Sequence, residues 1–246
     1  MQLRQLILLF LIALLATGCG AVNRNIQIED GETIDGDVRN VNGTIRIGKD
    51  CTISGDVRNV NGAIHVDSGT RLGSLRNTNG AIELADEVQA DAIRGTNGRI
   101  RIGAQSTVSS GVNNTNGAIE LAEQVTVGGD VENTNGAVRI AEGGRIAGTV
   151  STRNGAMTLT AASAGAIASA NGHVELLDGT RVTGELHARE TSGRSSGDVP
   201  RIIIGRDVVI EGPVRIDRPV RLYVHETATT GEISGAEATI FSGDQP

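Results

Sequence analysis

VRNVNGAIHV, residues 57–66, joins an Asn-Gly pair to short runs in which apolar and polar residues alternate. Similar stretches recur along the chain, as VRNVNGTIRI from residue 38, LRNTNGAIEL from 75, VNNTNGAIEL from 112 and VENTNGAVRI from 131. Asn-Gly occurs eight times between residues 42 and 172, at successive spacings of 19, 18, 18, 19, 19, 19 and 17 residues. A fixed repeat of this length is typical of a solenoid.

The residues around each glycine follow one apolar pattern. The positions five before, two after and four after the glycine are apolar in all eight repeats. The alternation has a period of two and covers only four or five residues, with Gly, Asn, Asp and Ser between the runs, which indicates strands and not helices. Each buried aliphatic side chain contributes roughly 1.5–3 kcal/mol. One repeat is therefore too small to fold alone, whereas a stack of repeats can fold.

Two β architectures fit this pattern: an antiparallel meander with a hairpin at each Asn-Gly, and a parallel β-helix whose equivalent residues stack about 4.8 Å apart. The inward-facing residue three before the glycine favours the β-helix. It is asparagine in five repeats, and buried asparagines need partners, which stacked coils would supply as a ladder of amides. These residues are Asn40, Asn59, Asn77, Asn114 and Asn133.

We therefore expect an all-β fold, a single-stranded parallel β-helix of right-handed winding with about 18–19 residues per coil. The repeat domain covers 26–186 and is followed by a polar loop, HARETSGRSSGDV, over 187–199. Residues 200–246 hold all four prolines and are expected to form irregular final coils and a cap. About eleven coils would give a rod on the order of 50 Å long.

Stacking also predicts two columns of charged side chains. Glu83, Arg101, Glu120 and Arg139 would form a column of alternating sign, which is favourable across neighbouring strands. A second column would hold only arginines and would be a solvated face or a contact for an anionic surface. Its members are Arg39, Arg58, Arg76 and Arg94.

The composition argues against binding to nucleic acid. The formal net charge is −7, and Lys49 is the only lysine. Phe10, Tyr223 and Phe241 are the only aromatic residues of the Phe, Tyr and Trp type. A nucleic-acid-binding protein needs a clustered basic face, and single strands are usually held on aromatic side chains. We expect no nucleic-acid partner.

The N-terminus has the features of an export signal. Arg4 precedes an unbroken apolar run over 6–15, which is too short to span a bilayer but long enough for a signal-peptide core. The following LLATGCG, residues 14–20, resembles the lipobox of bacterial lipoproteins, although Ala16 stands where lipoboxes prefer Leu.

This resemblance implies a signal peptide over 1–18, lipidation of Cys19 and a short tether over 19–25. A lipoprotein cysteine carries enough acyl chains for stable membrane anchoring, and Gly20 after it implies sorting to the outer membrane of the cell envelope. The alternative is an ordinary secretory signal with an incidental Cys19. If Cys19 is lipidated, Cys51 has no partner, and we interpret it as a small buried hydrophobe, with a reactive thiol as the alternative.

The sequence contains no catalytic, cofactor-binding or metal-binding motif of a common type. Four histidines are scattered and are interpreted as ordinary surface residues: His65, His173, His187 and His225. The acidic stretch EDGETIDGD, residues 29–37, fits no calcium-binding spacing and is interpreted as a turn of the first coil. We expect no cofactor and no catalysis.

The Asn-Gly-x-Ile-x-Val coils resemble bacterial adhesin-type domains built as short-coil β-helices and, more distantly, bactofilins, which polymerise end to end as scaffolds. The resemblance covers about residues 26–186 and implies an architecture without catalytic residues. We expect a membrane-anchored, non-catalytic scaffold or adhesion module with an envelope polysaccharide or protein as partner. A polysaccharide-active β-helix enzyme and a self-polymerising scaffold are the alternatives.

Overall fold

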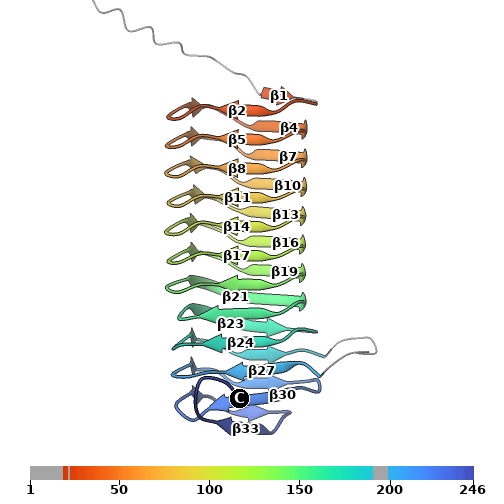
Figure 1. Ribbon diagram of the computed structural model, residues 1–246, viewed down its shortest axis with the longest axis vertical. Coiled ribbons are helices and arrows are strands. Elements are labelled where there is room, and N and C mark those ends of the chain that lie inside the picture. Colours follow the sequence, from red (N-terminus) through yellow and green to blue (C-terminus); the bar gives the residue numbers. More distant parts are fainter. Residues whose placement is uncertain (1–18, 22, 191–198) are drawn as a thin grey trace, which may run out of the picture.

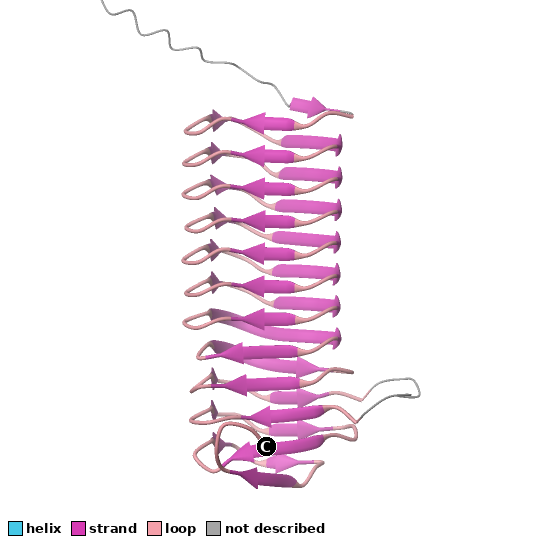
Figure 2. Cartoon of the chain, viewed as in Figure 1, coloured by secondary structure: helices cyan, strands magenta, loops and turns pink. Residues whose placement is uncertain are grey.

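The computed structural model describes residues 19–21, 23–190 and 199–246. These residues contain strands and turns without a helix, and Figures 1 and 2 show the strands stacked as one tall column of coils. Each coil adds up to three short strands, one to each of three ladders that run along the axis. The predicted all-β parallel β-helix is therefore confirmed.

The strands of the three ladders have the following bounds. The first ladder contains β1 Cys19–Ala21, β4 Val38–Asn42, β7 Val57–Asn61, β10 Leu75–Asn79, β13 Ile93–Asn97, β16 Val112–Asn116, β19 Val131–Asn135, β21 Arg145–Asn154, β23 Ser163–Ser169, β26 Leu186–Ala188, β29 Val214–Ile216 and β32 Ile233–Ser234. The second contains β2 Ile26–Ile28, β5 Ile45–Ile47, β8 Ile64–Val66, β11 Ile82–Leu84, β14 Ile100–Ile102, β17 Ile119–Leu121, β20 Val138–Ile140, β22 Met157–Thr160, β24 Val174–Leu177, β27 Arg201–Ile204, β30 Arg221–His225 and β33 Ala238–Phe241. The third contains β3 Thr33–Ile34, β6 Thr52–Ile53, β9 Arg71–Leu72, β12 Gln89–Ala90, β15 Thr107–Val108, β18 Thr126–Val127, β25 Arg181–Val182, β28 Val209–Ile210 and β31 Thr229–Thr230, together with the first residues of β21 and β23.

The register of the first ladder decides between the two architectures. Val57 pairs in parallel with Val38 of the preceding coil and with Leu75 of the following coil. A hairpin at Asn61 would instead have placed Val57 opposite Val66 in an antiparallel pair. The meander alternative is therefore wrong, and the period of 18–19 residues is the length of one coil.

The core is a single column of aliphatic side chains inside the three ladders. It extends from Ile28 near the first coil to Val224 near the last. Burial follows the expected alternation, since Val57 and Asn59 are 0% and 3% exposed whereas Arg58 between them is exposed. Because each inward residue packs on its equivalents above and below, the stack stabilises coils that could not fold singly.

The Asn-Gly corner requires glycine for two reasons. Gly62 has a φ of +116°, a conformation that residues with a side chain rarely adopt. A Cβ atom on Gly62 would also lie 2.3 Å from the carbonyl oxygen of Gly43 in the preceding coil. The glycines therefore permit both the sharp turn and the close approach of successive backbones.

The structure corrects the expected role of the buried asparagines. Their burial is confirmed, with Asn40 at 3% and Asn77 at 1% exposure, but they form no ladder with one another. Asn77 donates its side-chain amide to the carbonyl oxygens of Gly62 and Gly80, at 2.8 and 3.0 Å. These corner carbonyls have no strand partner, so the buried amide turns toward them and away from its equivalent in the next coil.

The ladder of amides forms instead on the exposed asparagines of the Asn-Gly pairs. Asn61 donates to the Asn42 side-chain oxygen and Asn79 to that of Asn61, each over 2.8 Å. The same bond continues through the later coils, from Asn97, Asn116, Asn135, Asn154 and Asn171.

The ends of the chain differ in part from the predicted segments. Residues 19–25 were expected to be a tether, yet Cys19–Ala21 forms strand β1, which pairs with β4. Within the predicted loop 187–199, the first two residues belong to β26, and 191–198 lie outside the described residues, as does the predicted signal peptide over 1–18.

The C-terminal segment, 200–246, continues the ladders. Ile202 pairs with Val174 and Leu222 pairs with Ile202, so the expected final coils belong to the same solenoid. The last residues fold back against its side, where Arg206 bonds Asp244 over 2.9 Å (Figure 1).

Candidate ligand-binding face

The predicted column of arginines is present on the first ladder. Arg39, Arg58, Arg76 and Arg94 occupy β4, β7, β10 and β13 and pair in register, each opposite the next. We call these four residues the arginine column. Neighbouring like charges on a sheet are unfavourable, yet the register of the coils places these four arginines on adjacent strands.

Two members of the arginine column have an acidic partner within their own coil. Arg39 forms an ion pair with Asp37, and Arg58 with Asp56 over 2.7 Å. The backbone N–H of Asp56 and the guanidinium of Arg39 hold the pKa of Asp37 below its ordinary value. In both coils the aspartate lies two residues before the arginine, on the same face of the strand.

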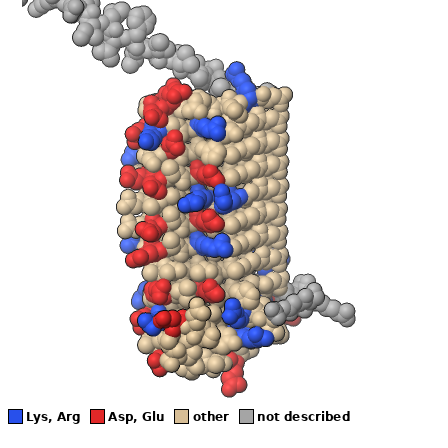
Figure 3. Space-filling model, viewed as in Figure 1, with Lys and Arg blue, Asp and Glu red and all other residues tan. Residues whose placement is uncertain are grey.

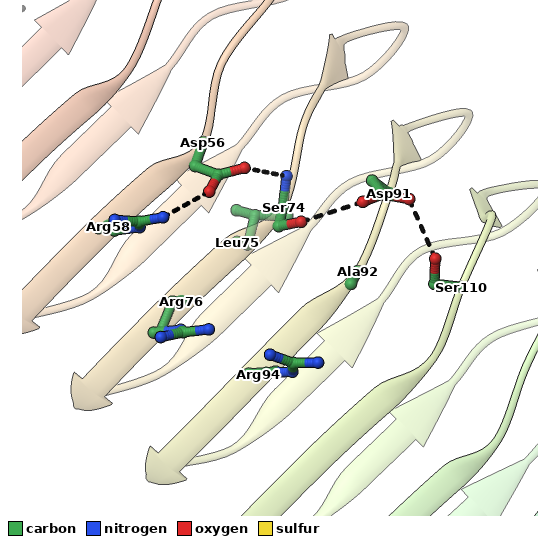
Figure 4. Close-up of a pocket in the computed structure, with 9 residues that line it drawn as sticks. All are labelled: Asp56, Arg58, Ser74, Leu75, Arg76, Asp91, Ala92, Arg94 and Ser110. Atoms are coloured by element: carbon green, nitrogen blue, oxygen red, sulfur yellow. Dashed lines mark hydrogen bonds and ion pairs between the residues drawn. The ribbon is translucent and has the colours of Figure 1, made fainter.

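The other two arginines have no aspartate at the equivalent position. Two residues before Arg76 is Ser74, and two residues before Arg94 is Ala92. Among residues 19–21, 23–190 and 199–246, neither Arg76 nor Arg94 forms an ion pair with any carboxylate. Both side chains are exposed, and Figure 4 shows them side by side on adjacent strands.

A small hollow of about 190 Å³ opens beside these two arginines, at the start of their strands (Figure 4). Its polar wall is ordered by Asp91, which accepts hydrogen bonds from the hydroxyl groups of Ser74, over 3.2 Å, and Ser110, over 3.0 Å. Each carboxylate oxygen of Asp91 therefore accepts a hydrogen bond from a serine of a neighbouring coil, and Asp91 forms no ion pair with Arg76 or Arg94. Sequence reasoning missed Ser74 and Ser110, although Ser74 breaks the aspartate pattern of the two preceding coils.

A second, shallower hollow of about 660 Å³ lies on the other side of the same two arginines. Its lining includes the neutral hydrogen-bonding residues Thr96, Asn113 and Thr115. Glu132, two coils below Arg94 in the same column, forms its far end. Arg76 and Arg94 therefore separate two polar hollows, one of which ends at a negative charge.

The predicted column of alternating charge is also in register, on the second ladder. Glu83, Arg101, Glu120 and Arg139 pair in that order across β11, β14, β17 and β20. Figure 3 shows this alternation of red and blue along the visible face. Arg139 lies 3.6 Å from Glu120, in agreement with the prediction.

At the upper end of that column, however, the ion pairs differ from those expected. Glu83 contacts Arg99 over 2.8 Å and His65 over 3.1 Å, and it forms no ion pair with Arg101 among the described residues. Arg99 directly follows the corner glycine of its coil, at a position that is alanine in the two neighbouring coils. From this position its guanidinium contacts Glu83. Its hydrogen bond is the main reason why the pKa of Glu83 is lowered.

A second polar cluster lies lower on the first ladder, within and directly beside β26 and β29. His187 Nε2 is 2.6 Å from Asp217, and Arg215 is 3.4 Å from the same carboxylate. Glu185 lies 4.0 Å from Arg215. The bond from His187 is the largest cause of the lowered pKa of Asp217. Arg215 contacts both carboxylates of this cluster, as in a structural network.

The other residues singled out in the sequence do not converge. His65, His173 and His225 lie on different coils, and His173 Nδ1 accepts the backbone N–H of Arg201. His225 is only 4% exposed and packs edge-on against Phe241, so its interpretation as a surface residue was wrong. Cys51 is buried and free, as expected. Within the described ranges, no group of three or more His, Cys, Asp or Glu residues is arranged to hold a metal ion.

Cys19, the predicted lipidation site, is the first residue of β1. Among the residues with a described position, no helix is long and apolar enough to cross a membrane. No protein-family model, curated protein or solved structure matches the chain.

Proposed function

We propose that this chain is a lipid-anchored, non-catalytic β-solenoid of the bacterial cell envelope that serves as a scaffold or adhesion module. One observation carries the proposal: the strand pairing continues from β1 and β2 to β32 and β33, with a register shift where β21 pairs with β23, so surface residues of successive coils keep fixed relative positions above and below that shift. Such a body can present a row of side chains at constant spacing without reorganisation on binding.

The position of Cys19 supports the anchoring part of the proposal. Because β1 begins at Cys19 and pairs with β4, a lipid at this residue would hold the first coil directly at the membrane surface. The resemblance of residues 14–20 to a lipobox supports attachment of the lipid to Cys19. Gly20, directly after this cysteine, supports sorting to the outer membrane. A column joined to its anchor without a long linker suits a scaffold that must project from a membrane.

Cell fractionation with Cys19→Ser tests the anchor. The wild-type chain should be found with the membranes and acquire radiolabelled palmitate, whereas Cys19→Ser should carry no label and leave the membrane fraction. An unchanged distribution of the variant would contradict lipid anchoring. Capture of envelope components by the Cys19→Ser chain, with denatured protein as the control, tests for a partner.

Polysaccharide cleavage is a second candidate, favoured by one hollow of about 500 Å³ on the first ladder. It contains the carboxylates of Glu132 and Glu190 together with Arg153 and Arg189. Two carboxylates that face one cavity are the arrangement used for glycoside hydrolysis. Release of reducing ends from polysaccharide by the wild type, and loss of this release in Glu132→Gln or Glu190→Gln, would establish it.

End-to-end self-association is a third candidate, favoured by the last strand. Among the described strands, β33 pairs only with β30, and its Ile240 is 64% exposed. An open strand edge can pair with another chain. Sedimentation of the Cys19→Ser chain should show assemblies that Ile240→Asp disrupts; only monomers at high concentration would remove this candidate.

A further inference from the structure

The arginine column differs from the other charged columns in how its charges are balanced. On the second ladder, arginine and glutamate alternate, so positive charge there is met by negative charge within the chain. In the arginine column four positive side chains follow one another. In the first two coils each arginine forms an ion pair with an aspartate two residues earlier. In the next two coils the equivalent positions hold the uncharged residues Ser74 and Ala92. Arg76 and Arg94 are therefore the part of the column that can receive an external anion.

The spacing of these groups favours a polymer over a single small anion. Successive strands of a sheet are about 4.8 Å apart, so the backbone positions of the four arginines repeat at about this interval along the axis. Each guanidinium can bind a carboxylate or sulfate through two parallel hydrogen bonds. An extended chain with an acidic group on successive units could bond several arginines at once, and each further contact would occur at a high effective concentration.

The walls of the two hollows favour a polymer that carries hydroxyl groups. Ser74 and Ser110 lie in the smaller hollow, and Thr96, Asn113 and Thr115 lie in the larger one. The two serine hydroxyls, which donate to Asp91, can still accept hydrogen bonds from sugar hydroxyls, whereas the threonine and asparagine side chains of the larger hollow can both donate and accept them. Tyr223 and Phe241, the only Tyr and Phe residues after Phe10, belong to β30 and β33, far from the column. This face therefore has no platform for stacked nucleobases.

We propose that the arginine column, with Arg76 and Arg94 at its centre, binds an acidic polysaccharide that lies along the solenoid axis. The acidic groups are held by the guanidiniums, and the sugar hydroxyls by the serine, threonine and asparagine side chains beside them. Glu132 marks the lower end of the site because it would repel the polymer. The inference rests on the proposed adhesive function, for which it names the class of ligand.

The experiment measures binding of the full chain in detergent to polygalacturonate, which carries carboxylates, and to dextran sulfate, with neutral dextran as the control. At least one acidic polymer should bind much more tightly than neutral dextran, and which one binds identifies the acidic group. Arg76→Ala/Arg94→Ala should weaken binding at least tenfold, because the charge-assisted bonds of two guanidiniums are lost. Arg76→Lys/Arg94→Lys should bind with intermediate affinity, since lysine keeps the charge and loses the paired bonds.

Two matched variants separate a local site from general charge attraction. Arg71→Ala removes an exposed arginine from the third ladder and should leave affinity within twofold of the wild type. Glu132→Gln should tighten binding, whereas Glu123→Gln, at an exposed turn, should not. Circular dichroism would verify that all variants keep the β fold.

The proposal is overturned if Arg76→Ala/Arg94→Ala binds as the wild type does, or if Arg71→Ala weakens binding equally. It is also overturned if polyphosphate or vesicles of anionic phospholipid bind the column while both acidic polysaccharides do not. Failure of the anchor is a separate result: Cys19→Ser could remain in membranes while polysaccharide binding still depends on Arg76 and Arg94.

Discussion

The side-chain amide of Asn61 donates a hydrogen bond to the side-chain oxygen of Asn42, 2.8 Å away and 19 residues earlier in the chain. This bond can form only if the two Asn-Gly corners lie directly above one another. Its repetition along the corner ties each coil to the next by a side-chain contact in addition to the backbone bonds, such as Gly43 N–H to Asn61 C=O over 2.9 Å.

Asn97→Ala should destabilise the solenoid by about 1–3 kcal/mol, because Asn97 bonds both Asn79 and Asn116 and each bond contributes about 0.5–1.5 kcal/mol. Urea unfolding followed by circular dichroism measures the change. Asn113→Ala is the control, since the Asn113 side chain forms no hydrogen bond to another described residue, and it should change stability by less than about 0.5 kcal/mol. Equal effects of the two variants would show that the ladder contributes nothing.

Gly80→Ala should be more destabilising than Gly36→Ala, although both glycines have a positive φ, of +124° and +112°. At Gly36 the new Cβ meets no atom within 4 Å, so only backbone strain of about 1–2 kcal/mol is expected. At Gly80 the Cβ would lie 2.4 Å from the carbonyl oxygen of Gly62, and the coils would have to move apart. We expect a loss of about 3 kcal/mol or more, measured by urea unfolding; similar losses would contradict the close approach.

Cys51 should react slowly with iodoacetamide in the folded protein. Burial raises the pKa of its thiol, and Sγ lies 3.1 Å from the carbonyl oxygen of Glu29. In Cys19→Ser, which leaves a single thiol, alkylation should be on the order of 100-fold or more slower than in urea. Reaction at the same rate in both states would contradict burial.

The raised pKa of Cys51 also predicts the direction in which the stability of the folded protein changes with pH. The folded state disfavours the thiolate, so the unfolded chain releases the proton first as pH rises. The associated stability is fully present below the unfolded pKa and is lost at more alkaline pH. Cys51→Ala should reduce this alkaline loss of stability, measured by urea unfolding at several pH values.

The pKa of Glu83 should rise toward its ordinary value in Arg99→Ala, because the hydrogen bond from Arg99 is the largest cause of its lowering. NMR titration of the Glu83 side-chain carboxyl measures it directly. Since the folded pKa is lowered, the stability that Glu83 contributes is present above its unfolded pKa and is lost as pH falls through the folded pKa. Arg101→Ala should have a smaller effect, and the opposite order would contradict the observed pairing.

Much of the fold could be predicted because the repeat length fixes the register. Once residues 18 or 19 apart are aligned, the sequence places Val57 beneath Val38 and Arg58 beneath Arg39, as the structure does. The orientation of an amide is not contained in such an alignment. The buried asparagines, Asn40 and its equivalents, were therefore expected to form the ladder of amides that the exposed asparagines, Asn42 and its equivalents, form instead. The corner carbonyls need hydrogen-bond donors, and this need becomes apparent only once the turn geometry is known.

The candidate site was predicted in part. Arg76 and Arg94 followed from the register, but their lack of an acidic partner depends on Ser74 and Ala92, two residues earlier on the same face. The significance of Ser74 and Ala92 at these positions becomes apparent only once the ion pair of Arg58 with Asp56 is known. The two hollows beside the arginines arise from side-chain packing between coils, which a periodic pattern does not specify.

Parallel registry is the central claim, and a hydrogen-bond scalar coupling measured by NMR tests it most directly. The Val57 N–H donates to the carbonyl oxygen of Ser74 in the next coil over 2.9 Å. A coupling between the Val57 nitrogen and the Ser74 carbonyl carbon is the predicted result. A coupling from Val57 to the carbonyl of Val66 would show an antiparallel hairpin and contradict the β-solenoid.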